Sequence, residues 1–385
     1  WTLSGTSDTT GIFTRQVTIS TVDTVRKSVT ATVSWPSQTG TAQVSVTSRL
    51  TNWLAALPVT KSWSNAIVAG SANPTGTVAG LKIDTVGNYA YMVENTSTSS
   101  FVIVNIANPA APSIASTTTL SNIATNIAVS GNFAYITTNT GTSGLLIYDI
   151  SNPAAPSLVK TLGFIGTAAA KGIFINGNFA YVVRAGSTTT NSNEFNVINI
   201  TTPASASIVG GYNNDATMNE VWASGNFAYV AQSATTTSIA EMVVINVTTP
   251  SAPTLAASYN PTGTNTVLTI TGAGSTVYLG YASTVNSVNI TTPTAPATLG
   301  TLALSGAVQD LDIDGANDLF AGTADTAGEF QIINVTTPST MSLIKKVDVT
   351  GTTSTVNGVS YDSSLDYVAG TSASTTQRLL VFTKN

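Results

Sequence analysis

The sequence contains neither cysteine nor histidine, and few of its residues carry a charge. Without cysteine there are no disulfides and no thiolate to act as nucleophile or metal ligand. Without histidine the most common general base and metal ligand is missing. The 13 Lys and Arg residues are scattered over 385 positions, so they form no basic patch for nucleic acid. The composition therefore argues against the common catalytic centres and against nucleic-acid binding.

Uncharged polar residues take the place of the missing charges. Only 8% of the residues are charged, whereas the chain has 67 Thr and 42 Ser. The hydrophobic share of 42% is enough for a large core. We therefore expect a surface that is polar without being ionic. The sequence begins at Trp1 without Met, which we interpret as a processed or truncated N-terminus.

One pattern recurs through most of the chain. Its best copy is Gly131-Asn132-Phe133-Ala134-Tyr135, followed by an apolar run and an Asn-Pro pair at Asn152-Pro153. The closing aromatic residues lie 44, 46, 48, 49, 42 and 47 positions apart; they are Tyr91, Tyr135, Tyr181, Tyr229, Tyr278, Phe320 and Tyr367. A period in the mid-forties with strand-like content is typical of a four-stranded propeller blade. The spacing predicts an all-β fold with seven blades.

Hydrophobic alternation assigns the strands within one unit. We predict strands over 124–129, 133–137, 145–150 and 157–162. Gly131-Asn132 suits a tight turn that needs a positive φ. A short polar side chain precedes the Pro in six units, and we expect it to cap the turn there; these residues are Asn105, Asp149, Asn199, Asn246, Asn289 and Asn334.

The two ends of the repeat region complement each other. Residues 66–76 echo residues 255–263, which form the outer strand of a blade and its exit loop. The last unit stops soon after Leu379–Phe382 and lacks an outer strand of its own. We therefore expect strand 66–70 to complete the last blade and close the ring, which reduces the number of open sheet edges. This assigns residues 63–385 to one propeller domain.

The pattern resembles the LVIVD-repeat propellers. The likeness rests on units such as Leu146-Ile147-Tyr148-Asp149-Ile150-Ser151-Asn152-Pro153 and covers residues 66–385. The seventh unit departs from it, with Thr383 where Asp or Asn is expected. Such proteins are mostly secreted or surface-located and often have no defined catalytic role. The resemblance therefore implies an extracellular location more than an activity.

Residues 1–62 do not follow the repeat. Polar and apolar residues alternate over 13–19, 28–35 and 42–47, which predicts three antiparallel strands. Residues 36–40, which begin at Pro36 and end at Gly40, supply the turn between the last two. A sheet of this size is too small for a full core. We therefore expect it to pack on another element, or on a helix that the sequence lacks.

This segment resembles the C-terminal part of type IV pilin-like proteins, in particular minor pilins. The likeness is carried by residues 1–7, 13–15, 27–35 and 50–53. In that family a hydrophobic N-terminal helix lies upstream and builds the filament. The resemblance implies other pilin or surface-protein subunits as partners, and membrane attachment only through such a missing helix. The alternative is an ordinary β-rich N-terminal domain.

One motif suggests a metal. Asp310, Asp312 and Asp314 lead into Gly315 as D-x-D-x-D-G, the opening of a calcium loop in which alternating carboxylates wrap the cation. The twelfth position is Ala321 instead of Glu. The competing interpretation is an inner strand in which apolar residues alternate with these carboxylates. A non-standard calcium site would need one more ligand, from Asp318 or Asp325. Calcium is the one cofactor that the sequence suggests.

Other candidates are modification sites and carboxylates. Asn-x-Ser/Thr sequences occur at Asn95 and at four of the turn-capping positions, and Asn95 is the better glycosylation acceptor. Two carboxylates could hydrolyse a glycoside if they converged. We interpret the scattered carboxylates as isolated surface charges; they are Glu194, Asp215, Glu220 and Glu241.

Loops rich in Ser and Thr follow the second strand of several units, as at 186–193 and 233–238. In register they share one face, which could bind glycans, carry O-glycans or form a plain polar surface. We expect a non-catalytic extracellular protein whose pilin-like module carries the propeller as an adhesion or interaction head. Its partners would be surface-protein subunits, glycans or a cell surface. The alternatives are a structural filament or sheath subunit and, third, a glycan-processing enzyme.

Overall fold

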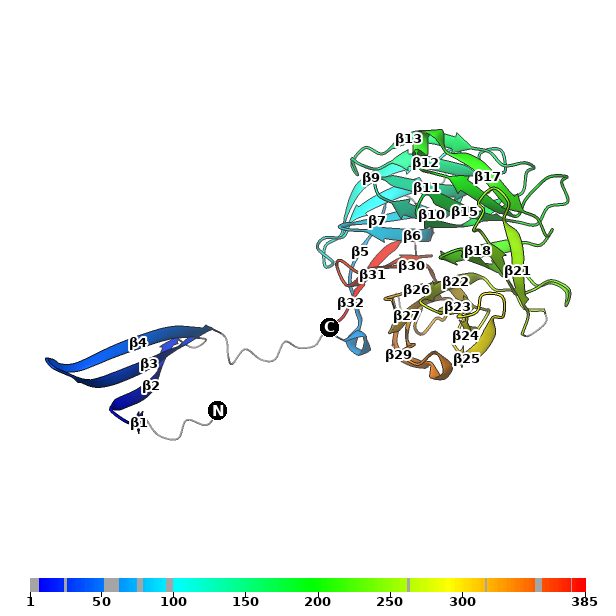
Figure 1. Cartoon of the computed structure of the whole chain (residues 1–385). Helices are drawn as coiled ribbons and strands as arrows, with labels where there is room; N and C mark the ends of the chain where they lie inside the picture. The colour runs from blue at the N-terminus through cyan, green and yellow to red at the C-terminus, as the bar shows by residue number, and fades with distance from the viewer. Residues whose placement is uncertain are drawn as a thin grey trace. The chain divides into compact units, whose positions relative to one another are not determined.

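The computed structural model describes residues 7–23, 26–51, 62–74, 79–94, 100–261, 264–315, 317–349, 355–374 and 376–385 (Figure 1). These residues form eight four-stranded antiparallel sheets. The chain divides into two compact units, Trp1–Lys61 and Ser62–Asn385. The division falls one residue before the expected boundary, and each unit is described by itself below.

The first unit is a single sheet of four consecutive strands, β1 (Ser7–Thr10), β2 (Phe13–Asp23), β3 (Arg26–Ser37) and β4 (Gly40–Thr51). The strands are longer than alternation predicted. Pro36 and Ser37 continue β3 and pair with Thr41 and Gly40, so the turn shrinks to two residues. Gly40 has a φ of 126°, a conformation that favours glycine.

The part of the second unit that the structure describes contains seven four-stranded sheets, and in six of them the four strands are consecutive in the chain. The first three sheets contain β6 (Gly80–Val86), β7 (Tyr89–Glu94), β8 (Ser100–Asn105) and β9 (Ser113–Thr119); β10 (Ala124–Ser130), β11 (Phe133–Thr138), β12 (Leu145–Asp149) and β13 (Ser157–Leu162); and β14 (Ala170–Asn176), β15 (Phe179–Arg184), β16 (Phe195–Asn199) and β17 (Ser207–Tyr212).

The fourth, fifth and sixth sheets contain β18 (Met218–Ser224), β19 (Phe227–Gln232), β20 (Met242–Asn246) and β21 (Thr254–Tyr259); β22 (Thr269–Ala273), β23 (Thr276–Gly280), β24 (Thr284–Asn289) and β25 (Ala297–Ala303); and β26 (Val308–Ile313), β27 (Asp318–Thr323), β28 (Phe330–Asn334) and β29 (Ser342–Val347). Among the described residues, three short 3-10 helices lie between strands, η1 (Trp63–Asn65), η2 (Pro203–Ser205) and η3 (Pro338–Thr340).

The seventh sheet draws its strands from both ends of the unit. Its order is β30 (Val356–Asp362), β31 (Tyr367–Ser372), β32 (Leu379–Thr383) and β5 (Ile67–Ala72). Strand β5 pairs antiparallel with β32, with Gly70 opposite Val381. The residues expected to complete the last blade therefore lie in its outer strand.

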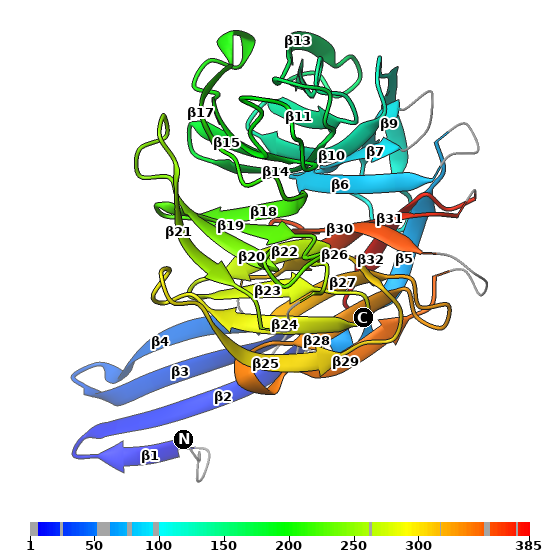
Figure 2. The same ribbon diagram turned by 90° about the vertical axis from the view of Figure 1, so that its right-hand side faces the viewer.

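The inner strands gather toward the middle of the unit in a propeller-like arrangement (Figure 2). Each inner strand packs beside the inner strand of the next sheet, and β30 of the seventh sheet packs beside β6 of the first. The outer strands β9, β13, β17, β21, β25 and β29 lie at the periphery (Figure 2). Both faces of the middle strands are covered, so their apolar runs are fully buried.

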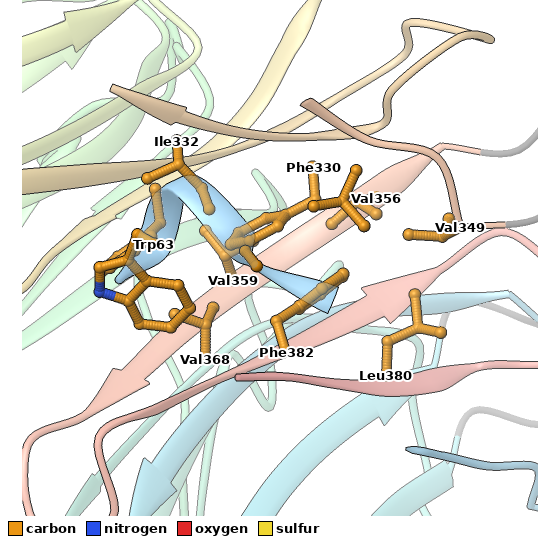
Figure 3. Close-up of a cluster of buried hydrophobic side chains, with 12 residues drawn as sticks. Trp63, Phe330, Ile332, Val349, Val356, Val359, Val368, Leu380 and Phe382 are labelled. Carbon is orange, nitrogen blue, oxygen red and sulfur yellow. The ribbon is translucent and has the colours of Figure 1, made fainter. Parts of the chain in front are cut away.

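Hydrophobic clusters fill the space between neighbouring sheets. Figure 3 shows the one between the sixth and seventh sheets. The rings of Phe330 and Phe382 stack with centroids 4.0 Å apart. Trp63 of η1 packs edge-on against Phe320 at 4.8 Å. Each fully buried aromatic side chain contributes about 2–3 kcal/mol of hydrophobic stabilisation, so the start of the unit is held firmly to its end.

The second unit's repeat follows the sequence prediction closely. The four strands of the second sheet begin at the predicted residues and end within one residue of the predicted ends. Gly131 has a φ of 56° in the β10–β11 turn, as predicted. The carbonyl or carboxylate oxygen of each predicted capping side chain accepts a hydrogen bond from the backbone amide two residues later. The turn-capping prediction is confirmed at all six positions.

The closing aromatic residue predicted for the seventh unit, Tyr367, lies two residues before the structurally equivalent position, which Ala369 occupies. Tyr135 pairs with Ile147, and the equivalent pair in the seventh sheet is Ala369 with Val381. Tyr367 instead pairs with Thr383, in the place that Phe133 takes opposite Asp149. Thr383 does occupy the expected Asp or Asn position.

Candidate functional site

The inner strands of the second unit surround a central cavity, which we call the channel. It has a volume of about 280 Å³, with residues from all seven sheets in its wall. Asp84 of β6, Glu220 of β18, and Asp310 and Asp312 of β26 supply its carboxylates. Four carboxylates in a narrow channel need hydrogen bonds or cations to be tolerated.

Lys82 is the cation at the centre of this group. Its Nζ lies 2.5 Å from Oδ1 of Asp310 and 3.9 Å from Oε2 of Glu220. Asn126 donates from Nδ2 to the same Glu220 oxygen at 2.6 Å. These four side chains come from the first, second, fourth and sixth sheets. We call Lys82, Asn126, Glu220 and Asp310 the channel layer.

Backbone amides of adjacent sheets satisfy the other carboxylate oxygens. Asp84 accepts from the amide of Val129 at 2.6 Å, and Asp312 accepts from that of Tyr361 at 2.7 Å. Asp310 accepts from the amide of Val359 at 3.1 Å. Each bond crosses to the inner strand of the next sheet. The channel carboxylates therefore join neighbouring sheets.

Burial dominates the electrostatics of the channel. It raises the pKa of Asp84 to about 6, and those of Glu220 and Asp312 to about 7, although the hydrogen bonds to each carboxylate act in the opposite direction. For Lys82, burial works to lower the pKa, but the charges of Asp310 and Glu220 together outweigh it and raise the pKa. The channel layer thus holds a charged lysine beside a carboxyl that titrates near neutral pH.

A second hollow of about 470 Å³ lies on the side of the channel layer where the inner strands begin. We call it the mouth hollow. Lys171 of β14 lies in its wall, donates to Oδ1 of Asn219 at 3.3 Å, and has a pKa that burial lowers and Glu220 partly restores. Asn139, from the loop after β11, and Gln309 of β26 also line it. The hollow falls within the usual size range of small-molecule sites.

The three Asp residues of the expected calcium loop do not converge. Asp310 and Asp312 bond to the seventh sheet as described, whereas Asp314 accepts from the amides of Asn317 and Asp318 and closes the β26–β27 turn. Asp325 pairs with Lys346 at 2.8 Å. Within the described residues no group of three or more His, Cys, Asp or Glu side chains could hold a metal ion. Asp310 and Asp312 thus lie in the inner strand β26, as the strand-alternation interpretation expects, and the calcium site stays a prediction.

The expectation of isolated surface charges was wrong for three of four carboxylates. Glu194 and Glu241 have no exposed surface, and Glu220 is 8% exposed. Glu194 accepts from the amides of Ser187, Asn214 and Asp215, so it ties two loops together. Asp215 is exposed as expected. Glu194 lies directly before β16, the third strand of its sheet. The sequence gave no sign that it is buried, because its hydrogen-bond partners come from loops.

The remaining candidates lie elsewhere. Asn95 lies outside the described residues. The Ser/Thr-rich loop 186–193 is not wholly a plain surface, because Ser192 is fully buried and accepts from Nη1 of Arg184 at 3.2 Å. The sequon residues Asn199, Asn246 and Asn289 use their side-chain oxygens in turns.

The sheet of the first unit has two unlike faces. The register places Arg15, Val33 and Val44 in one row across β2, β3 and β4, and Val17, Ala31 and Val46 in the next. Phe13, Ile19, Trp35 and Ala42 share this face by the alternation of side chains. We call it the apolar sheet face, and Arg15 is its charged member among the side chains described in 9–20 and 28–48.

Hydroxyl groups cover the opposite face. Thr30 and Thr47 share a hydrogen bond of 3.0 Å across β3 and β4, and Thr32 and Ser45 share one of 2.8 Å. Such cross-strand pairs stabilise a solvated sheet surface. The sheet is therefore amphipathic, with a polar face that suits water.

The described side chains of the apolar sheet face are exposed or only half-buried. Ile19, Val44 and Val46 are 57%, 58% and 66% exposed. None of the side chains described in 9–20 and 28–48 is buried. A sheet without a covered face lacks the apolar burial that independent stability requires. Among the described residues no helix has the length and apolarity to span a membrane.

Comparison with known proteins identifies the repeat. The LVIVD repeat family matches residues 80–119, 122–162, 168–214 and 217–261, so the chain contains LVIVD repeats, as the sequence resemblance indicated for these residues. The resemblance over the rest of 66–385 stays a prediction. The match does not extend to residues 1–61, and their resemblance to pilins stays a prediction. No curated protein matches the chain.

A solved structure shares the fold. A functionally unknown protein from Desulfotomaculum acetoxidans DSM 771 aligns with a TM-score of 0.58 and 12% sequence identity, over 74% of this chain and 89% of that one. At this identity the likeness concerns the fold alone.

Proposed function

We propose that this chain is a non-catalytic interaction protein of the cell exterior. Residues 62–385 form a closed seven-bladed propeller that acts as the interaction head. Residues 1–61 attach the head to other surface-protein subunits through the apolar sheet face. The observation that carries the proposal is that this face is exposed on a sheet with no buried side chain among those described.

The contact between the seventh and first sheets supports closure. A Cβ on Gly70 of β5 would clash with the carbonyl oxygen of Pro109 in the first sheet's loop. Gly210 stands in the same relation to Pro250, between the third and fourth sheets. The join between the two ends of the unit thus repeats an ordinary contact between neighbouring blades, which is expected when a ring closes.

A buried ion pair supports closure as well. Nη1 of Arg378, just before β32, lies 2.5 Å from Oε1 of Glu94 at the end of β7. Arg378 also donates to Oδ1 of Asn73 and to the carbonyl of Pro74, which follow β5. One side chain therefore connects the seventh sheet, the exit of β5 and the first sheet.

The channel supports a binding role over a catalytic one. Asp84, Asp310 and Asp312 hold the amides of neighbouring sheets, and Glu220 bonds to Asn126. These carboxylates serve the rigidity of the ring. A rigid ring that presents loops on one face is a common scaffold for recognition. The uncharged Ser/Thr surface suits many polar contacts outside the cell.

Attachment can be tested with charges on one strand. Val44→Asp with Val46→Asp places two carboxylates on the apolar sheet face, whereas Ser45→Asp with Thr47→Asp places them on the opposite face of β4. Full-length protein is expressed in its native source, and its assemblies are analysed by light scattering and electron microscopy. We expect the first variant to be absent from the assemblies and the second to be incorporated into them.

Equal incorporation of both variants would contradict attachment through this face. The same assemblies distinguish this proposal from the structural alternative, in which the chain is a filament or sheath subunit without a ligand. In that case the loop face of the head is buried between copies, whereas an interaction head leaves it accessible to antibodies.

A further inference from the structure

Strands from five of the seven sheets line the mouth hollow at the axis of the ring. Leu81, Lys171, Asn219 and Gln309 come from the first, third, fourth and sixth sheets, and Asn126 comes from the second. Leu268, directly before β22, and Asn139, in the loop after β11, complete the wall. Its floor is the channel layer, since Lys82, Asn126 and Glu220 border both this hollow and the cavity beneath. A site at this place is preorganised, because its wall is part of the packed ring.

The two lysines of the hollow differ in their partners. The charge of Lys82 is compensated by Asp310 and Glu220. Lys171 has its one hydrogen bond to a neutral amide oxygen, and within the described part of the chain no carboxylate lies within salt-bridge distance of it. A partly buried ammonium that has no carboxylate in direct contact favours an anionic group from outside.

The rest of the lining is uncharged. Asn219 uses its side-chain nitrogen on Ser233 and Val267, so it holds Lys171 in place. The side chain of Asn139 has no hydrogen-bond partner among the described residues, and that of Gln309 donates only to the carbonyl of Ala307. Free amide groups suit hydroxyl groups, which both donate and accept. Leu81 and Leu268 supply apolar surface beside them.

We propose that the mouth hollow binds an acidic sugar, with Lys171 meeting its carboxylate and Asn139 and Gln309 meeting its hydroxyl groups. This inference rests on the proposed role of the propeller as an interaction head and names the class of ligand that the head recognises. A uronic acid at the end of a glycan has the required chemistry: one carboxylate, several hydroxyl groups and an apolar ring face.

Binding should strengthen as the pH falls. Lys82, Asp310 and Lys171 are the titratable groups that face Glu220, and burial raises the pKa of Glu220 to about 7. Between about pH 8 and pH 6, Glu220 gains a proton and a negative charge beside Lys171 disappears. The sugar carboxylate stays ionised over this range, so its attraction to Lys171 increases.

The test is calorimetric titration of the full chain with a glucuronic-acid-terminated disaccharide, its glucose-terminated counterpart and sodium acetate. We expect the acidic sugar to bind at least about tenfold more tightly than the neutral one, the equivalent of one charge-assisted hydrogen bond. Lys171→Gln removes this difference and Lys171→Arg retains it. Lys160→Gln on the outer strand β13 is the matched control and changes nothing. Glu220→Gln removes the pH dependence.

Equal affinity for the acidic and neutral sugars would overturn the proposal. So would a Lys171→Gln variant that is folded, as shown by a wild-type melting temperature, and that binds the acidic sugar with unchanged affinity. Acetate that competes as well as the acidic sugar would overturn the sugar assignment, as would binding of a peptide C-terminus in its place. Asn139→Ala provides a second variant at an exposed side chain. It is expected to lower the affinity for the sugar and to leave the affinity for acetate unchanged. None of these outcomes tests attachment through the apolar sheet face. If that attachment holds, the Lys171 variants still assemble whether or not they bind the sugar.

Discussion

The ammonium of Lys82 lies 2.5 Å from Oδ1 of Asp310, a residue 228 positions later in the chain. Lys82 belongs to the first sheet and Asp310 to the sixth, so the bond passes the inner strand of the seventh sheet. Asp310 in turn accepts from the amide of Val359 on that strand. Asp310 therefore links the sixth sheet to both the first and the seventh.

Removing the lysine should destabilise the propeller. Lys82→Met leaves Asp310 and Glu220 without their cation in a buried channel, so we expect the free energy of unfolding to fall by about 3–5 kcal/mol. Guanidinium unfolding of the full chain measures the change. Lys160→Met, on the outer strand β13, is the control and should cost less than about 1 kcal/mol. Similar losses for the two variants would show that the channel pair contributes no more than a surface lysine.

The propeller should lose stability as the pH rises. The pKa values of Glu220 and Asp312 are raised to about 7 in the folded protein, from 4.5 and 3.8. The folded state thus binds more protons than the unfolded state between these values. Their contribution is fully present below about pH 4 and is lost as the pH rises through about 7.

For Glu220 alone the shift corresponds to stabilisation on the order of 3 kcal/mol at low pH. Unfolding curves at about pH 5 and pH 8 measure it, and the Glu220→Gln variant should show a smaller slope with pH. The exposed Asp215→Asn variant serves as control and should keep the wild-type slope. Stability that stays level or increases over this interval would contradict burial of these carboxyls.

A side chain at Gly70 should loosen the join between the ends of the propeller. Gly70→Val forces β5 away from the backbone of Pro109, and we expect a loss of about 1–3 kcal/mol. Hydrogen exchange should become faster in β5 and β32, while the second sheet keeps its protection. Ser71→Ala, the next position on the same strand, is the control. Unchanged exchange in β5 would mean that the first and seventh sheets are not in contact at this point.

The turn-capping position should distinguish acceptor from non-acceptor side chains. The Oδ1 of Asn246 accepts from the amide of Thr248 at 2.9 Å, and Asp149 makes the same bond to Ser151 at 2.8 Å. Asn246→Ala should therefore cost about 1 kcal/mol, whereas Asn246→Asp should be close to neutral. Thermal unfolding separates the two variants. An equal loss in both would show that the turn depends on the amide nitrogen instead.

The sequence predicted most of the repeat because its determinants are local. The turn glycine Gly131 and the apolar run before Pro153 lie within one unit, and they place β10 to β13 to within a residue. The seventh unit lacks that glycine. Its β30–β31 turn is longer and uses Asp366 with a φ of 57°, so the next aromatic residue, Tyr367, was assigned to the wrong position.

The channel could not be read from the sequence in the same way. The partners of Glu220 are distant in the chain, with Asn126 and Lys82 94 and 138 residues away. Burial and pairing there follow from the packing of the inner strands of different sheets beside one another. Asp310 and Asp312 alternate with apolar residues, and both a calcium loop and an inner strand show this pattern. Only the position of the neighbouring strand β30, whose amides bond to the two carboxylates, shows how these side chains are used.

The most direct test of the account uses the absence of cysteine from the chain. A single cysteine is introduced as Val46→Cys on the apolar sheet face or as Thr47→Cys on the opposite face of the same strand. Native assemblies of each full-length variant are treated with a water-soluble thiol reagent, and the labelled fraction is measured by mass spectrometry. The account predicts that Val46→Cys is protected in the assembly and labelled in dissociated protein, while Thr47→Cys is labelled in both. Equal labelling of the two positions in the assembly would contradict attachment through the apolar sheet face.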